Sequence, residues 1–341
     1  MTAYFGLDIG SSSIKVTQST LMGSKAFSVD AIGLAMNPAG SVDFINPSVR
    51  EKIGPAIKQL LAESKIRDKR VVVSVAENRV YSRILSMPVM SEAELASAIK
   101  WEAEQFVPIP VAEVELDFSI VQQPTNTSED KKMLVYLVAA PKTYLQALVD
   151  FLVNVGLDPI AIESEMVAVS RSLTFGTTPA TTLIVHMGAM SSVLAIVDGM
   201  SLSFSYVTES GGVALTRALS QALAFPLPQA EEYKRTYGLD PSQLEGKVRS
   251  GLLIVLDTVV SEMRKAMEYH LSSRKTRVTR IVLSGGGAYL PQLSSHISEI
   301  FGGMEVVVGD PMIAAKPSRG VEIPRERAVY SVSVGLSQRV F

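Results

Sequence analysis

Short apolar runs broken by glycine and polar turns dominate the beginning of this chain. The apolar residues of 4–9 stop at a glycine-serine turn and resume at 14–16, a pattern that predicts a tight β-hairpin. A helix is predicted for residues 49–64, because apolar residues recur there at helical spacing. The consecutive valines of 70–76 predict a strand that is buried on both faces. Strands and helices mixed in this way predict an α/β fold.

The pattern of the first hairpin recurs in the middle of the chain. Residues 181–197 again read as strand, polar residue, glycine, small residues and strand. His186 takes the place of Asp8, and Gly188 takes the place of Gly10. In both copies a further strand follows the hairpin. Two matching units half a chain apart predict two related lobes that face one another, with a cleft able to hold the phosphates of a nucleotide from both sides.

The turn of the first hairpin has the composition of an anion site. Glycine and small hydroxyl residues let successive backbone N–H groups converge on a phosphate. Asp8 ends the first strand, where its carboxylate could hold Mg²⁺ directly or through water, and Lys15 could neutralise phosphate oxygens. The alternative is an ordinary hairpin with a surface lysine and a turn aspartate. The turn itself consists of Gly10, Ser11, Ser12 and Ser13.

A third glycine-rich element follows a buried-looking strand at 280–284. It is the turn Gly285, Gly286 and Gly287, and a helix is predicted to follow at 291–301. A turn of glycines at the end of a strand lets a base or a ribose approach the backbone closely. A plain strand-to-helix connection explains the same residues. Neither the dinucleotide-binding fingerprint nor the Walker loop is present in the sequence.

The remaining segments predict two further groups of elements. Within 80–155 the pattern predicts three strands and two helices, the first helix starting at a capping box of Ser91 and Glu94. Residues 226–273 are predicted to be helical, with a break at 238–241, and residues 329–341 are predicted to form a last core-packing helix.

These motifs, in this order and spacing, resemble the actin-like ATPase superfamily. The closer resemblance is to the PilM family of type IV pilus assembly proteins. It covers nearly the whole chain, including 91–110, which resembles the inserted subdomain of that family, and it is most specific in 101–110. Gly211, Gly212 and the segment 230–234 also fit. The resemblance implies an actin-like (ribonuclease H-like) bilobal ATPase fold with an FtsA-type inserted subdomain. The implied parts are a first-lobe core of 1–79 and 156–179, an inserted subdomain of 80–155, a second-lobe core of 180–225 and 276–341, and an upper second-lobe region of 226–275.

The resemblance also implies that ATP or ADP binds with Mg²⁺ between the lobes. The residues implied for the nucleotide are Asp8, which also holds the metal, Gly10, Ser11, Ser12, Ser13, Lys15, Gly188, Gly211, Gly212, Glu231, Lys234, Arg264, Gly285, Gly286 and Gly287. Glu231, Lys234 and Arg264 could equally be ordinary surface charges.

Hydrolysis is expected to be slow or absent. Actin-like enzymes that hydrolyse ATP generally use a second acidic residue in the second hairpin, and His186 takes that place here, with Val193 later in the hairpin. A neutral imidazole is a poor substitute for a carboxylate toward Mg²⁺. Nucleotide binding is therefore expected to be weak or regulatory. In the alternative interpretation, His186 is held by backbone groups at the end of its strand.

The resemblance implies a peptide partner as well. In relatives, a groove beside the inserted subdomain takes the N-terminal cytoplasmic peptide of the membrane protein PilN. Trp101 and Phe106, followed by the prolines at 108 and 110, suit peptide docking. Alternatively, both aromatic side chains pack onto their own sheet. Other inner-membrane and motor components of the pilus are further expected partners, and self-association is open.

Composition narrows these expectations. Of the 341 residues 47% are hydrophobic and 19% are charged, which is typical of a folded globular protein. A net charge of −2 argues against nucleic acid as the main partner. The absence of cysteine excludes disulfides and fits a reducing cytoplasm. The longest apolar stretches, such as 252–256, are too short to cross a bilayer, so we expect a cytoplasmic protein that reaches the inner membrane only through partners.

Two other functions compete with a pilus scaffold. An FtsA-like cell-division protein, which polymerises on the membrane, would carry an amphipathic C-terminal helix behind a linker, and residues 329–341 do not have that pattern. A small-molecule kinase of the same fold would need an intact second carboxylate, and His186 argues against it. The three histidines show no metalloprotease spacing, and no acyl-transfer serine motif is present.

Overall fold

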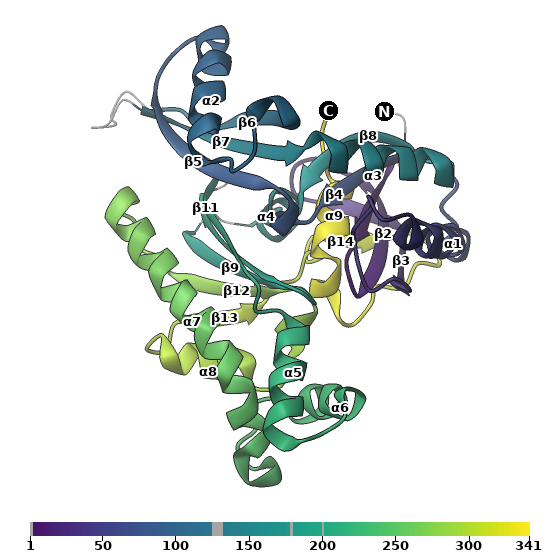
Figure 1. The fold of residues 1–341 in the computed structure, drawn as a ribbon, viewed down its shortest axis with the longest axis vertical. Helices are drawn as coiled ribbons and strands as arrows, with labels where there is room; N and C mark the ends of the chain where they lie inside the picture. Colours follow the sequence, from purple (N-terminus) through teal and green to yellow (C-terminus); the bar gives the residue numbers. More distant parts are fainter. Residues whose placement is uncertain (1–2, 125–131, 178–179, 200) are drawn as a thin grey trace.

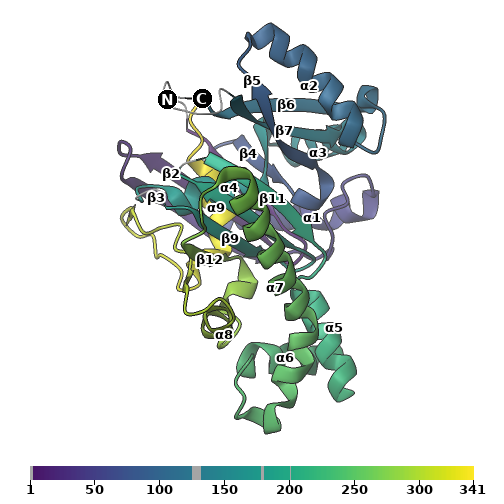
Figure 2. The same cartoon turned by 90° about the vertical axis from the view of Figure 1, so that its left-hand side faces the viewer.

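The computed structural model describes residues 3–124, 132–177, 180–199 and 201–341. Two mixed sheets form the cores of two lobes, and a smaller three-stranded sheet lies at one end of the molecule (Figure 1). The described start of the chain lies beside its end, since the ring centres of Tyr4 and Phe341 are 5.4 Å apart, and Figure 2 shows the smaller sheet at the same end of the molecule. Among the described residues, none of the helices combines the length and the apolar character that crossing a membrane requires.

The first lobe is built on a six-stranded sheet of order β14-β3-β2-β1-β4-β8. The first three strands form an antiparallel meander, and β4 and β8 continue the sheet in parallel with β1. Five of the six residues of β4 are buried, as its run of valines predicts. The strands are β1 (Phe5–Ile9), β2 (Ser13–Leu21), β3 (Phe27–Met36), β4 (Arg70–Val75), β8 (Asp158–Ser164) and β14 (Ala315–Pro317); helices α1 (Pro47–Glu63) and α3 (Lys142–Val155) pack on one face.

The second lobe repeats this plan on a five-stranded sheet of order β11-β10-β9-β12-β13. Its first three strands again form an antiparallel meander, and β12 runs parallel to β9 as β4 does to β1. The repeat predicted from the two hairpins is therefore a repeat of topology. The elements are β9 (Thr182–Met187), β10 (Ser192–Asp198), β11 (Ser201–Thr208), α5 (Gly212–Leu223), α6 (Leu227–Tyr237), α7 (Lys247–Arg274), β12 (Arg280–Ser284), α8 (Leu293–Ile300) and β13 (Glu305–Val308).

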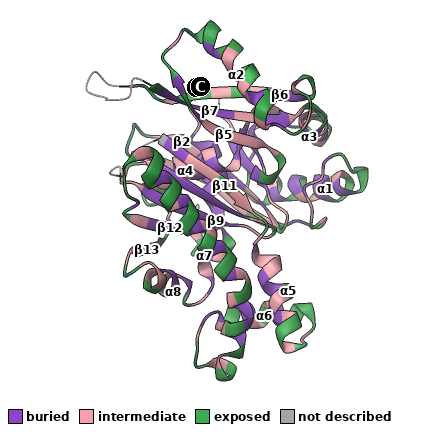
Figure 3. Ribbon diagram, turned by 60° about the vertical axis from the view of Figure 1, so that its left-hand side comes forward, coloured by how far each residue is buried: buried purple, intermediate pink, exposed green. Residues whose placement is uncertain are grey.

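Two helices lie between the sheets. Side chains of α4 (Glu165–Thr174) and α9 (Ser331–Ser337) share one apolar cluster with Val72 of the first sheet and Ile184 of the second. Gly335 allows the two helices to approach closely, because a Cβ there would collide with the backbone carbonyl of Ala168. All seven residues of α9 are buried, and Figure 3 shows exposed residues mainly on outer helices such as α2, α6 and α7. The helices thus fix how the two lobes meet.

The last part of the chain returns to the first lobe, which the sequence did not predict. The resemblance implies that residues 276–341 belong to the second lobe, but β14 pairs with β3 and α9 packs on β1, β2 and β4. The reason lies in the local sequence. Strand β14 has only three residues, one of them proline, so it gives no recognisable strand signal. Helix α9 has seven residues, and its apolar pattern does not indicate which sheet it will cover.

The inserted subdomain consists of a three-stranded sheet of order β5-β7-β6 with one covering helix, α2 (Glu92–Phe106). The resemblance implies that α3 also belongs to it, but the buried face of α3 packs in the core of the first lobe. The predicted capping box is present, since the hydroxyl of Ser91 accepts from the amide of Glu94 and the Glu94 carboxylate accepts from the amide of Ser91. The strands are β5 (Tyr81–Pro88), β6 (Val114–Gln122) and β7 (Lys132–Pro141), and short 3-10 turns lie at Glu77–Arg79, Val111–Glu113, Gln243–Gly246, Gly286–Tyr289 and Arg327–Tyr330.

Candidate nucleotide cleft and peptide groove

The two hairpin turns are closed by corresponding backbone hydrogen bonds. In the first, the amide of Gly10 donates to the carbonyl of Ser13 at 3.0 Å; in the second, the amide of Gly188 donates to the carbonyl of Ser191 at 2.9 Å. The strand registers agree as well: Asp8 lies opposite Lys15 on β2, and the matching position His186 lies opposite Val193 on β10. The correspondence inferred from the sequence therefore holds residue by residue.

The first hairpin carries a buried ion pair. The Nζ of Lys15 lies 3.0 Å from Oδ2 of Asp8, and the aspartate is only 3% exposed. The turn is held from behind by Asn37, whose side-chain amide donates to the carbonyl of Gly10 at 2.9 Å and whose backbone amide donates to the carbonyl of Ser12. Ser12 itself is exposed. The turn residues are thus fixed in place beside a carboxylate and an ammonium group.

The second hairpin is uncharged at the same position. The Nδ1 of His186 is hydrogen-bonded to the hydroxyl of Ser284 at 3.1 Å, and burial lowers the pKa of His186 to about 4. Its partner is therefore a side-chain hydroxyl, whereas the sequence interpretation suggested backbone groups. Asp8 and Lys15 also act on the His186 pKa, in opposite directions, which places the two hairpins near one another. At neutral pH the imidazole carries no charge.

Two glycines support the second turn from the start of α5. The amide of Gly212 donates to the carbonyl of Gly188 at 2.9 Å, and the next amide donates to the carbonyl of Ala189 at 2.8 Å. A Cβ at Gly211 would lie 2.6 Å from that same carbonyl oxygen of Ala189. Only glycine fits at 211 without moving the backbone of the turn.

Lys234 and Glu231 join this cluster from α6. The Nζ of Lys234 donates to the carbonyl of Gly212 at 3.0 Å, to the hydroxyl of Thr216 at 2.9 Å and to the carboxylate of Glu231 at 2.6 Å. The lysine is 8% exposed. It is therefore a buried cation with three partners, and its interpretation as a surface charge is wrong.

The glycine turn after β12 lies against the end of β9, next to the second hairpin turn. A Cβ at Gly285, whose φ is 76°, would lie 2.5 Å from the carbonyl oxygen of Met187, and one at Gly287 would lie 2.6 Å from the Met187 Cβ. At Gly286 a Cβ would meet no atom within 4 Å. The turn thus packs closely on one side and is open at its middle residue.

Arg264 does not join the other predicted residues. It is exposed on α7, and its guanidinium lies 5.8 Å from the centre of the Phe301 ring beyond the end of α8. The structure therefore brings together the two hairpins, the start of α5, the α6 pair and the glycine turn, and leaves Arg264 apart from them.

The sequence did not single out two glutamates near the first hairpin, the buried Glu77 and the half-buried Glu165. Glu165, the first residue of α4, accepts a hydrogen bond from the backbone amide of Glu77 at 3.2 Å. Burial, and then the negative charge of Asp8, raise the pKa of Glu165 to about 8. The acidic group beside Asp8 thus comes from α4 and not from the second hairpin. Its only sequence signal is a glutamate directly after a predicted strand.

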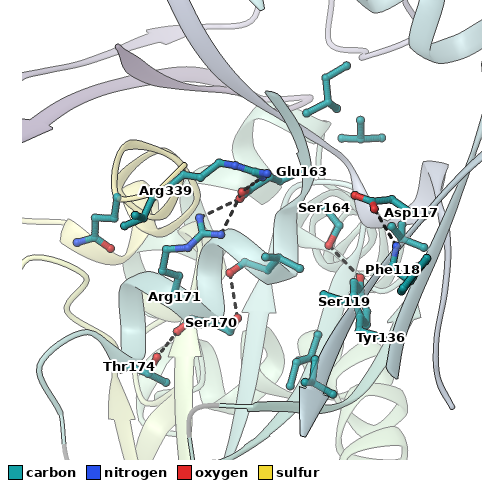
Figure 4. A pocket seen from close by; sticks show the side chains of 18 of the residues that line it. Asp117, Phe118, Ser119, Tyr136, Glu163, Ser164, Ser170, Arg171, Thr174 and Arg339 are labelled. Carbon is teal, nitrogen blue, oxygen red and sulfur yellow. Dashed lines mark hydrogen bonds and ion pairs between the residues drawn. The ribbon is translucent and has the colours of Figure 1, made fainter. Parts of the chain in front are cut away.

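A groove of about 1040 Å³ separates the inserted subdomain from the first lobe (Figure 4). In its wall, Glu163 of β8 binds Arg171 through both carboxylate oxygens, at 2.9 and 3.1 Å, and also binds Arg339. Gln338 lines the groove at 2% exposure, and neither the Nε2 nor the Oε1 atom of its side-chain amide has a hydrogen-bond partner among the described residues. Tyr136 of β7 reaches the hydroxyl of Ser164 at 3.1 Å. The groove therefore combines apolar walls with a fixed ionic cluster and an unsatisfied amide.

Trp101 and Phe106 do not line this groove. Both lie on α2, whose buried residues pack on the face of the inserted sheet that carries Val135 and Leu137, while Tyr136 and Val138 point to the groove. Phe106 packs at the edge of that core, 5.8 Å from the guanidinium of Arg83, as the alternative interpretation expected. Trp101 is 63% exposed. The two aromatic residues are therefore not part of this groove.

Comparison with known proteins places these features in a family. The family model described as "Type IV pilus assembly protein PilM" matches residues 6–341. A solved structure described as a PilM-PilN type IV pilus biogenesis complex has 24% identity over 98% of both chains, with a TM-score of 0.85. The ethanolamine utilization protein EutJ of Carboxydothermus hydrogenoformans has 14% identity over 99% of this chain and 89% of its own, with a TM-score of 0.57. MreB5 of Spiroplasma citri bound to AMPPNP has 12% identity over 98% and 95%, with a TM-score of 0.55. These matches show the actin-like fold.

Proposed function

This chain belongs to the PilM family of type IV pilus assembly proteins, and we propose that it is a nucleotide-binding scaffold of pilus biogenesis. It binds ATP or ADP with Mg²⁺ between its lobes, and it holds the N-terminal cytoplasmic peptide of a PilN-type membrane protein in the groove. It acts in the cytoplasm and reaches the inner membrane through that partner. Further inner-membrane and motor components of the pilus assemble on the same scaffold.

The observation that carries the nucleotide proposal is the pair of turns at Gly10 and Gly188. Each follows the end of a strand, each is closed by the same amide-to-carbonyl hydrogen bond, and the two lie near one another. The residues present fit a metal-bound phosphate chain. Asp8 supplies the hard carboxylate oxygen that Mg²⁺ prefers, and Lys15 lies 3.0 Å from it with charge to offer a phosphate. Mg²⁺, when bound, neutralises phosphate charge. The open middle residue of the glycine turn, Gly286, leaves space for the nucleoside.

The same geometry favours slow or absent hydrolysis. Phosphoryl transfer depends on charge and on the positioning of the attacking water. The second hairpin offers a neutral imidazole at His186 and an apolar side chain at Val193. Glu165 is an additional acid close enough for the charge of Asp8 to raise its pKa, and the raised pKa keeps much of it protonated at neutral pH, so it is a weak second anion. The nucleotide then serves to set the relation of the two lobes.

The peptide proposal is supported by a relative and by the groove. The solved relative with 24% identity is a complex of PilM with PilN. In this chain, apolar residues such as Ile162 and Val167 line the groove, and Gln338 and the Glu163 cluster supply polar groups. A mixed lining of this kind suits a short peptide with apolar and polar side chains.

Calorimetry and thermal unfolding test both parts. Mg-ATP is expected to bind the wild-type protein, and binding should depend on Mg²⁺. A synthetic peptide with the sequence of the PilN-type N-terminus from the same genome should raise the melting temperature, because a ligand that binds only the folded state stabilises it by about 2.7 kcal/mol at 100 times its Kd. Absence of a shift at saturating peptide would contradict the scaffold function, and absence of nucleotide binding would contradict the cleft.

A further inference from the structure

Strand β6 is an edge strand of the inserted sheet and lies along the groove. In the inserted sheet its only strand neighbour among the described residues is β7. The consecutive residues 117–121 all contribute to the groove lining, so the groove follows the strand and not merely one of its faces. An exposed edge presents a row of backbone donors and acceptors that another extended segment can pair with.

One hydrogen bond identifies which residues face that edge. The backbone amide of Phe118 donates to the carboxylate of its neighbour Asp117 at 2.8 Å (Figure 4). In an antiparallel pair, the N–H and C=O of one residue point to the same side, and the side alternates along the strand. Phe118 and, by the same alternation, Ile120 therefore direct their backbone groups away from β7, while Asp117 and Ser119 direct theirs toward it.

We propose that the peptide docks as an added strand along the outer edge of β6, with backbone hydrogen bonds to Phe118 and Ile120. This inference rests on the proposed function, because it takes the PilN-type N-terminal peptide as the occupant of the groove. An extended peptide places successive side chains on opposite faces. One set points to the apolar wall of Ile162, Val167 and Leu202, and the other set points outward.

In this arrangement the Asp117 carboxylate occupies the position that a carbonyl group of the peptide takes on docking, and we call this its placeholder role. Its carboxylate satisfies the Phe118 amide while the edge is free, and a charged side chain there opposes pairing with unselected strands. The docking peptide replaces the carboxylate with one of its own carbonyl groups. Across the groove, Glu163 holds Arg171 and Arg339 in fixed positions, so the facing wall is already ordered before the peptide arrives.

A backbone N-methyl scan of the peptide tests the proposal on the unmodified protein. Each variant peptide keeps every side chain and loses one N–H. We expect affinity to fall about tenfold at alternate positions and to change little at the positions between them, because only every second peptide amide faces β6. Tolerance of methylation at all positions would show that side chains alone hold the peptide, and would overturn the proposal.

Failure of the scan is distinguishable from failure of the proposed function. If the unmodified peptide binds without alternation, only the strand addition is wrong. If the unmodified peptide does not bind, the peptide function is wrong and the strand addition falls with it.

Variants of β6 provide the matching test on the protein side. Ile120→Pro removes an amide that faces the edge and leaves the bonds to β7, so the peptide should bind about tenfold more weakly than it does to Ile120→Val, which keeps the amide. Equal affinity of two folded variants would contradict the proposal. Asp117→Ala should bind several-fold more tightly because it frees the Phe118 amide; no gain would remove the placeholder role.

Discussion

The two hairpins of this protein have corresponding backbone hydrogen bonds and differ in their side-chain chemistry. Both turns close through the same amide-to-carbonyl bond across three residues, and both lie at the end of a central strand. The first has the ion pair of Asp8 and Lys15 at its paired positions, whereas the second has His186 and Val193. The backbone donors that could hold phosphate oxygens are thus kept on both sides, while charge is confined to one side.

We propose that this difference separates nucleotide binding from nucleotide hydrolysis. Backbone amides and one carboxylate with its lysine are sufficient to hold a metal-bound phosphate chain. Hydrolysis also needs charge and a positioned water at the far side of that chain. The second side is neutral, and the extra acid, Glu165, comes from α4 in a protonated or partly protonated state. The asymmetry therefore suits a protein that responds to nucleotide and hydrolyses it poorly.

The largest expected effect is a difference in Mg-ATP affinity between matched substitutions in the two hairpins. Asp8→Ala should lower the affinity for Mg-ATP about a hundredfold or more, since it removes the carboxylate proposed to hold Mg²⁺. His186→Ala, the same change at the matching position, should alter affinity far less. Isothermal titration calorimetry of both variants, with their folding checked by circular dichroism, measures the contrast. Unchanged affinity in Asp8→Ala would remove Asp8 from the site.

The next prediction concerns how the stability of the protein depends on pH in the absence of nucleotide and Mg²⁺, and it depends on the titration of Glu165. Its pKa is raised from 4.5 to about 8 by folding, so its contribution to stability is full below pH 4.5 and is lost as the pH rises through 8. His186 has a lowered pKa, and its opposing effect is confined to the range from 6.5 down to about 4. Between pH 6.5 and 8.5 the free energy of unfolding should therefore fall by roughly 2 kcal/mol.

Urea unfolding of Glu165→Gln provides the control for this pH dependence. The glutamine cannot titrate, so the fall in the free energy of unfolding over this range should largely disappear. An equal fall in the variant would assign the pH dependence to another group.

A smaller effect is expected when the missing carboxylate is restored. His186→Asp should increase the rate of ATP hydrolysis about tenfold if the neutral second hairpin limits turnover. His186→Asn, which has a similar shape and no charge, is the matched control. Phosphate release assays measure both. Equal rates in the two variants would show that another group is absent from the hydrolysis machinery.

The smallest effect tests whether His186 has a structural role. Ser284→Ala removes the hydroxyl bonded to the imidazole and leaves a buried ring nitrogen without that partner, which should lower stability by about 1 kcal/mol. Mg-ATP affinity should not change. A strong loss of nucleotide affinity with unaltered stability would instead place the His186 and Ser284 pair in the binding site.

Several parts of the structure were predictable because their signals are local. Each of these features depends on residues close together in the sequence. They are the hairpins, the capping box at Ser91, the buried valine strand and the break between α6 and α7. The recurrence of the hairpin also predicted the two-lobed topology, because repeated patterns produce repeated supersecondary units. The burial of Lys234 was not predictable, since its three partners include residues of another helix.

The sequence alone determined which strands turn back on themselves and where glycine, charge and capping residues lie, because these depend on neighbours in the chain. Only the tertiary structure decided that Glu165 lies near Asp8, that Arg264 and Trp101 lie apart from both sites, and that β6 leaves an edge beside the groove. The physical reason is that strand order and helix packing bring together residues far apart in the chain. Burial, pKa and free hydrogen-bonding capacity arise from those contacts.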